Sequence, residues 1–144
     1  MDEIIVGDQT ILFDRDATVA IYSSTETGGL LGCGCLSCQN FAVQRGSIYP
    51  PSFVAMLERL GIDPSKEGEA FEYGPTSDGR HLYGGWFYLI GELLVPGERS
   101  TTGREAPEFS YWFVKRAPTD KRFSPQLAVE FMTTIPWVLP EHPD

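Results

Sequence analysis

The sequence has no long apolar run, few basic residues and few cysteines, and each shortage excludes a class of protein. The longest apolar candidate, residues 82–95, contains three glycines and a glutamate and falls short of the roughly 20 residues of a membrane-spanning helix. Basic residues number 11 against 20 acidic ones, and the net charge of −9 opposes binding to a phosphate backbone. Three cysteines are too few, and odd in number, for a disulfide framework. We therefore expect neither a membrane nor a nucleic acid as partner.

The sequence also lacks several targeting and catalytic motifs. Two acidic residues follow Met1 where a secretory signal would have a basic region and then an apolar one, so we expect a cytoplasmic protein. There is no Gly-x-Ser-x-Gly motif, and the glycines of residues 28–34 match neither common phosphate-loop spacing. No reaction follows from these patterns, which leaves open whether the protein is an enzyme. A small molecule or another protein is the candidate partner.

What is present is enough apolar and aromatic side chain for a packed core. Apolar residues make up 42% and aromatic residues 12% of the 144 positions, above the content of a disordered chain. A chain of this length normally forms one domain, and no internal repeat or linker divides it. The sequence therefore predicts a single domain over residues 1–144.

Two segments predict short helices. Residues 36–45 contain neither glycine nor proline and precede Gly46, which predicts a helix that ends there. Residues 51–60 begin with a proline suited to the first helical turn and precede Gly61, which suits a left-handed cap. The apolar residues of this second helix repeat at the spacing of one helical face: Phe53, Met56, Leu57 and Leu60. We expect this stripe to be buried against a sheet.

The other periodic segments predict strands. Near the N-terminus, three short segments rich in β-branched and apolar residues are separated by brief turns, which predicts successive antiparallel strands: 4–6, 11–13 and 18–22. Three longer aromatic strands are predicted further along the chain: 82–94, 109–114 and 127–133. Gly84 and Gly85 interrupt the first of these and indicate either a bulge or a close approach of another group to the backbone.

Together these elements predict an α+β fold. We expect a mostly antiparallel sheet of about six to seven strands, because the connections between strands are too short for parallel crossovers. The helices at 36–45 and 51–60 should pack on one face of this sheet.

The three cysteines form a compact Cys-x-Cys-x-x-Cys motif, and their spacing suits a soft metal ion. Zinc in a structural site takes four nitrogen or sulfur ligands, so Cys33, Cys35 and Cys38 need one more. Of the two histidines, His142 lies near the C-terminus, where chains fray, and His81 begins a predicted strand. The predicted metal ligands are therefore Cys33, Cys35, Cys38 and His81, with zinc as the cofactor.

Two other interpretations of the cysteines stay open. Cys35 and Cys38 form a Cys-x-x-Cys pair at the start of a predicted helix, where the helix dipole stabilises a thiolate, so the pair could perform thiol redox chemistry with Cys33 as a resolving thiol. Alternatively the three thiols are small buried side chains without chemical function, since cysteine is among the most buried residue types. The protein would then be a metal-free module that binds a ligand or a protein.

Aromatic and basic residues offer a second candidate for binding. Five aromatic residues of the long strands could line a ligand groove, although at strand spacing they equally suit a core: Tyr83, Trp86, Tyr88, Tyr111 and Trp112. Residues 99–122 hold six basic residues against three acidic ones in an otherwise acidic chain. Such a segment usually solvates a surface, and the alternative is that it binds an acidic ligand or partner.

Four segments resemble a set of small bacterial proteins of unknown function: CGCLSCQNF, YPPSFVAMLERLGID, YGGWFYLIGEL and EFMTTIPWVLPE. The shared pattern is Cys-x-Cys-x-x-Cys-x-Asn-Phe, a short helix that ends in Gly-Ile-Asp, and a Gly-Trp hairpin, and it covers about residues 20–139. The resemblance implies no activity. It implies that Cys33, Cys35, Cys38 and Asn40 belong to a shared design, which favours a metal or redox role over packing.

Overall fold

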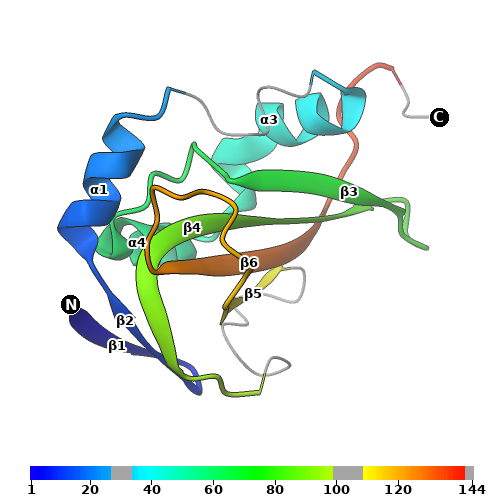
Figure 1. Ribbon diagram of the computed structural model, residues 1–144. Helices are drawn as coiled ribbons and strands as arrows, with labels where there is room; N and C mark the ends of the chain where they lie inside the picture. Colours follow the sequence, from blue (N-terminus) through cyan, green and yellow to red (C-terminus); the bar gives the residue numbers. More distant parts are fainter. Residues whose placement is uncertain (27–33, 99–108, 142–144) are drawn as a thin grey trace.

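The computed structural model describes residues 1–26, 34–98 and 109–141, and within these ranges it contains three helices and six strands. Their order along the chain is β1 (Asp2–Val6), β2 (Gln9–Phe13), α1 (Arg15–Ser23), α3 (Leu36–Ile48), α4 (Pro51–Leu60), β3 (Glu69–Pro75), β4 (His81–Val95), β5 (Phe109–Val114) and β6 (Gln126–Ile135). The predicted α+β class is confirmed (Figure 1). None of the described helices is long and apolar enough to cross a membrane.

The six described strands form one sheet, and every pairing in it is antiparallel. The strand order is β1-β2-β4-β6-β5, and β3 also pairs with β4. The 15-residue β4 is the central strand, because β6 pairs along one of its edges while β3 and β2 share the other. The long curved β4 therefore connects the two parts of the sheet (Figure 1).

Helices α3 and α4 cover one face of the sheet, as predicted. On α4, the side chains of Phe53, Leu57 and Leu60 are fully buried, and the Phe53 ring lies 4.9 Å from Phe109 and 4.8 Å from Tyr111. The predicted stripe is confirmed, with Met56 packed half-buried at its border. Burial of these large side chains supplies the main stabilisation of this layer, since each is worth about 1.5–3 kcal/mol.

The predicted strand at residues 18–22 is wrong, because this segment belongs to helix α1. The Asp14 side chain caps the helix by accepting a hydrogen bond from the Ala17 amide at 3.1 Å. The buried Thr18 hydroxyl accepts from the Ile90 amide at 3.1 Å, and the Tyr22 hydroxyl donates to the Tyr88 carbonyl at 2.6 Å. These contacts with β4 need a helical spacing and outweigh the β propensity of the branched residues.

Helix α3 does not end at Gly46 as predicted but continues to Ile48. A glycine within a helix costs about 1 kcal/mol relative to alanine, which makes Gly46 a weak stop signal. Ile48 and the following Tyr49 are both buried in the core, and the Tyr49 ring lies 5.4 Å from Phe131. Burial of these two residues compensates for the glycine.

Gly84 and Gly85 mark a close approach and not a bulge. The register between β4 and β6 runs without interruption from His81 to Ile90, and the irregularity lies in β3 between Glu72 and Gly74. A Cβ atom on Gly85 would lie 2.5 Å from the Glu69 carbonyl oxygen and 2.8 Å from the Phe131 ring. Only glycine fits at this position.

A buried glutamine at the start of β2 joins this strand to the edge strand β5. The Gln9 side-chain amide donates to the Phe113 carbonyl at 2.8 Å and the Pro96 carbonyl at 2.9 Å, and its oxygen accepts from the Phe113 amide at 2.7 Å. Gln9 is only 2% exposed. The Gln9 side chain therefore binds backbone groups of β5 that a neighbouring strand would otherwise bind.

Candidate functional site

The structure places two of the predicted metal ligands at the start of α3. Cys35 is the N-cap residue, and its sulfur accepts a hydrogen bond from the Cys38 amide at 3.3 Å. Cys35 is exposed, whereas Cys38 is buried. Cys33 lies outside the described residues. The predicted helix start is thus confirmed, while the convergence of the three sulfurs stays a prediction.

The fourth predicted ligand, His81, lies at the start of β4 and is almost fully buried. Its Nδ1 contacts the Glu72 carboxylate, and its ring packs 5.1 Å from the ring of Trp137. Glu72 also accepts a hydrogen bond from the Ser37 hydroxyl at 2.7 Å, which links His81 to the first turn of α3. A carboxylate behind one ring nitrogen is the usual support of a metal-binding histidine.

The described part of the chain contains no group of three or more His, Cys, Asp or Glu side chains arranged to hold a metal ion. Since Cys33 lies outside that part, the four-ligand zinc site stays a prediction. The chain also does not arrange Ser37 as a nucleophile activated by His81. Glu72 lies between the two, so the Ser37 hydroxyl donates to a carboxylate and not to the imidazole.

Asn40, which the resemblance groups with the cysteines, has a structural role. It is fully buried on α3, and its side chain accepts from the Val138 amide at 2.9 Å and donates to the Pro136 carbonyl at 3.2 Å. It also donates to the hydroxyl of Tyr83 at 3.4 Å. Burial raises the pKa of Tyr83 to about 12, so its hydroxyl stays protonated and donates to the Ser37 carbonyl at 2.8 Å. These bonds hold the segment after β6 against α3.

If His81 completes a zinc site with the three cysteines, protein purified without chelator should contain one equivalent of zinc per chain. His81→Gln and Cys38→Ser should each lower the bound zinc, measured by elemental analysis, while His142→Gln should leave it unchanged. Metal-free wild-type protein with three titratable thiols would refute the zinc prediction.

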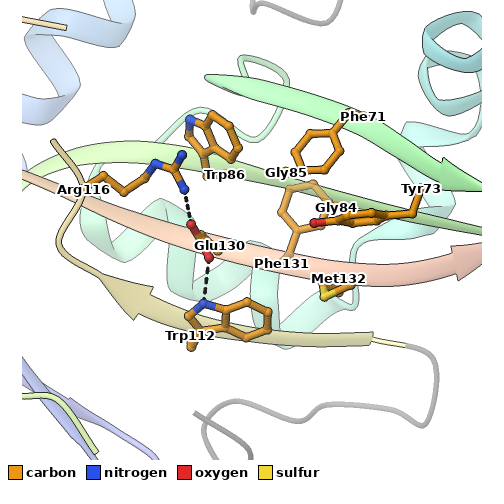
Figure 2. A pocket seen from close by; sticks show the side chains of 10 residues that line it. All are labelled: Phe71, Tyr73, Gly84, Gly85, Trp86, Trp112, Arg116, Glu130, Phe131 and Met132. Atoms are coloured by element: carbon orange, nitrogen blue, oxygen red, sulfur yellow. Dashed lines mark hydrogen bonds and ion pairs between the residues drawn. The ribbon is translucent and has the colours of Figure 1, made fainter. Parts of the chain in front are cut away.

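A hollow lies on the other face of the sheet, opposite α3 and α4. It is a groove of about 450 Å³ across β3, β4, β6 and β5 (Figure 2). Its floor is formed at Gly84 and Gly85, and it has one ion pair, Arg116–Glu130. Its remaining lining residues are large and apolar: Phe71, Tyr73, Trp86, Trp112, Phe131 and Met132. We refer to it as the aromatic groove.

Strand alternation and register bring these side chains together. On β4, Tyr83 and Phe87 face the helices, so Gly84 and Trp86 face the groove. The antiparallel register places Glu130 of β6 directly between Trp86 of β4 and Trp112 of β5. Three neighbouring strands thus form a row in which a carboxylate is flanked by two indoles.

One end of the aromatic groove is polar. The Arg116 guanidinium lies 3.9 Å above the centre of the Trp86 ring and pairs with the Glu130 carboxylate. Glu130 also accepts a hydrogen bond from the Trp112 indole nitrogen at 2.9 Å. The Trp86 indole nitrogen is buried and has no hydrogen-bond partner among the described residues. Figure 2 shows this nitrogen on the side of its ring toward Arg116.

The opposite end is apolar. Phe71 and Tyr73 of β3 form an edge-to-face pair with ring centres 4.9 Å apart, and Tyr73 is 60% exposed. A Cβ atom on Gly84 would lie 3.0 Å from the Tyr73 ring and 3.6 Å from the Phe71 ring, so the missing side chain lets these two rings pack against the strand. A flat apolar body can pack beside them.

The sequence identified part of this site. Of the five aromatic candidates, Trp86 and Trp112 line the groove, Tyr83 and Tyr111 are buried in the core, and the Tyr88 hydroxyl bonds to Thr119. Sequence reasoning missed five lining residues: Phe71, Tyr73, Glu130, Phe131 and Met132. The alternation of β6 places Glu130 and Met132 on one face, and this was the available signal.

The basic segment is only partly described, because Arg99 and Arg104 lie outside the described residues. Lys115 and Lys121 are exposed, as expected for a solvated segment. Arg116 is different, since it pairs with Glu130 and stacks on Trp86. Arg122 pairs with Asp120 at 2.7 Å.

No family model, curated protein or solved structure matches this chain. The resemblance to small bacterial proteins therefore stays a prediction. The candidate functions rest on the geometry of the two sites.

Proposed function

We propose that this protein is a ligand-binding module whose aromatic groove takes a small molecule with a flat, apolar body. The observation that carries the proposal is the groove itself, an open hollow with aromatic walls and two glycines in its lining, on the sheet face opposite α3 and α4. Its volume of about 450 Å³ lies within the 300–1,000 Å³ usual for small-molecule sites.

The walls favour an aromatic ligand over a flexible aliphatic one. Indole and phenyl rings lose little conformational freedom on binding, and offset or edge-to-face contacts between rings add about 0.5–1.5 kcal/mol to the burial of apolar area. Most of the lining is apolar, and the carboxylate of Glu130 is held by Arg116 and Trp112. This arrangement supports binding and positioning more than proton transfer.

Indole is a suitable neutral probe of the proposal. Titration followed by amide and indole N–H resonances should shift the signals of Trp86 and Trp112, which line the groove. The chain has three tryptophans, and the third, Trp137, packs on His81 and serves as an internal control. Its indole signal should not move.

A matched pair of glycine substitutions tests the location. Gly84→Leu would displace the Tyr73 and Phe71 rings from the wall of the groove and should abolish the shifts, whereas Gly46→Leu adds the same side chain where a Cβ meets nothing within 4 Å and should preserve them. Shifts confined to Trp137, or equal binding by both variants, would exclude the aromatic groove as the binding site.

A further inference from the structure

Two hydrogen-bond donors meet at the polar end of the aromatic groove without an acceptor between them. The Trp86 indole N–H is buried and has no partner among the described residues. The Arg116 guanidinium lies over the same ring, and one of its amino groups pairs with Glu130. A guanidinium has five N–H donors, so others remain for a ligand. Figure 2 shows the two groups side by side.

A buried donor without an acceptor is costly, and the adjacent guanidinium would strengthen the binding of an anionic acceptor there. An anionic oxygen at this end would accept from both the indole and the guanidinium. Charge-assisted hydrogen bonds of this kind are about twice as strong as neutral ones, and arginine suits carboxylates in particular.

The polar end of the groove is less suited to a cationic ligand. It would need Glu130, whose two oxygens are already engaged by Arg116 and by the Trp112 indole N–H. It would also have to displace Arg116 from the face of Trp86. An anion needs neither change, because it uses donors that remain.

The surrounding charge also favours an anion, although the whole chain is acidic. The segment between β5 and β6 contains Lys115, Arg116, Lys121 and Arg122 against a single acidic residue, Asp120. This segment lies over the open face, since Arg116 stacks on Trp86 and Thr119 bonds to the Tyr88 hydroxyl at 2.7 Å. Figure 1 shows it crossing in front of β4. Local positive charge therefore borders the polar end.

We infer that the ligand of the aromatic groove is an aromatic acid. Its ring lies on the glycine floor between Phe71 and Trp112, and its carboxylate binds the Arg116 guanidinium and the Trp86 indole N–H. This inference rests on the proposed function and adds the charge and orientation of the ligand.

Three probes share one ring system and differ in the charge of the side chain, so they test the effect of charge alone: indole-3-acetate, indole-3-acetamide and tryptamine. Dissociation constants from the same resonance titration should rank the acid first, about tenfold tighter than the amide, with the amine weakest. The Trp86 indole proton should move downfield with the acid only, because only the acid supplies an anionic acceptor.

Two variants locate the effect. Arg116→Gln should remove the preference for the acid and leave the affinity for the amide within about twofold, whereas Lys121→Gln should retain the preference, since Lys121 is exposed. Trp86→Phe keeps an aromatic ring but lacks the donor, and should weaken the acid several-fold more than the amide. It stands as an independent test if Arg116→Gln folds poorly.

The outcomes distinguish the two proposals. Equal binding of acid and amide in the groove would overturn the aromatic-acid inference and leave the proposed function intact. Tightest binding by tryptamine would overturn it in favour of a cation site at Glu130. Absence of any shift at Trp86 and Trp112 with all three probes would reject both.

Discussion

Replacing Arg45 with methionine should lower the free energy of unfolding by about 3–5 kcal/mol, because it leaves a buried carboxylate without its cation. The Glu67 side chain is completely buried, and Arg45 pairs with both of its oxygens at 2.9 Å. The third hydrogen-bond donor to Glu67 is the Tyr49 hydroxyl at 2.7 Å, which cannot neutralise the charge. Urea denaturation followed by circular dichroism would measure the loss.

Tyr49 is the other residue that binds the buried Glu67 carboxylate. Burial, followed by the charge of Glu67, raises the pKa of Tyr49 well above its usual value. The phenol therefore stays protonated at all ordinary pH values and remains a donor to Glu67. Arg45 and Tyr49 together connect the C-terminal part of α3 to the chain just before β3.

Two further variants test the cause of the Arg45→Met effect. Arg59→Met makes the same change at an exposed position of α4 and should alter stability by no more than about 0.5 kcal/mol. Adding Glu67→Gln to Arg45→Met should recover much of the loss, since the amide carries no charge and still accepts from Tyr49. Equal stability of Arg45→Met and Arg59→Met would show that the buried pair contributes little.

Replacing Gln9 with leucine should cost about 2–4 kcal/mol, because it leaves two buried backbone groups of Phe113 without partners. Leucine preserves most of the volume, so the loss reports mainly the hydrogen bonds to Phe113 and Pro96. The amide of Phe113 should also lose its protection in hydrogen exchange, because β5 is an edge strand and Gln9 is its acceptor there.

The control for Gln9→Leu is Gln39→Leu on the exposed surface of α3. It should change the free energy of unfolding by less than about 0.5 kcal/mol. Unchanged stability in Gln9→Leu, or unchanged exchange at Phe113, would contradict the role of Gln9 in holding the edge strand.

The sequence by itself determined the elements whose pattern is local. Helix α4 was predicted with its observed bounds because proline, an apolar face and a glycine cap all lie within residues 51–61. The long aromatic strands and their antiparallel pairing were also predictable, since alternation sets the faces and the connections are short. In the same way, the spacing of Cys35 and Cys38 placed them together at a helix start.

Helix α1 was decided by tertiary structure. Its branched residues favour a strand, and the segment is helical because Thr18 and Tyr22 reach β4 only at helical spacing. The sequence likewise did not indicate that Gln9 and Glu67 are buried, because their partners lie far away in the sequence, up to 104 positions for Gln9 and Phe113. A single polar residue in a sequence does not indicate whether it will be buried.

The aromatic groove depends on both the local sequence pattern and the tertiary structure. Alternation along β4 determined that Gly84 and Trp86 share a face, which can be read from the sequence. The row of Trp86, Glu130 and Trp112 depended on the register of three strands, and Trp86 and Glu130 lie 44 positions apart in the sequence. Register is fixed by the packing of a whole sheet against its helices, since a shift of one residue would turn each buried side chain outward. For this reason only part of the site, including Trp86 and Trp112, could be nominated from the sequence, and only the fold could assemble it.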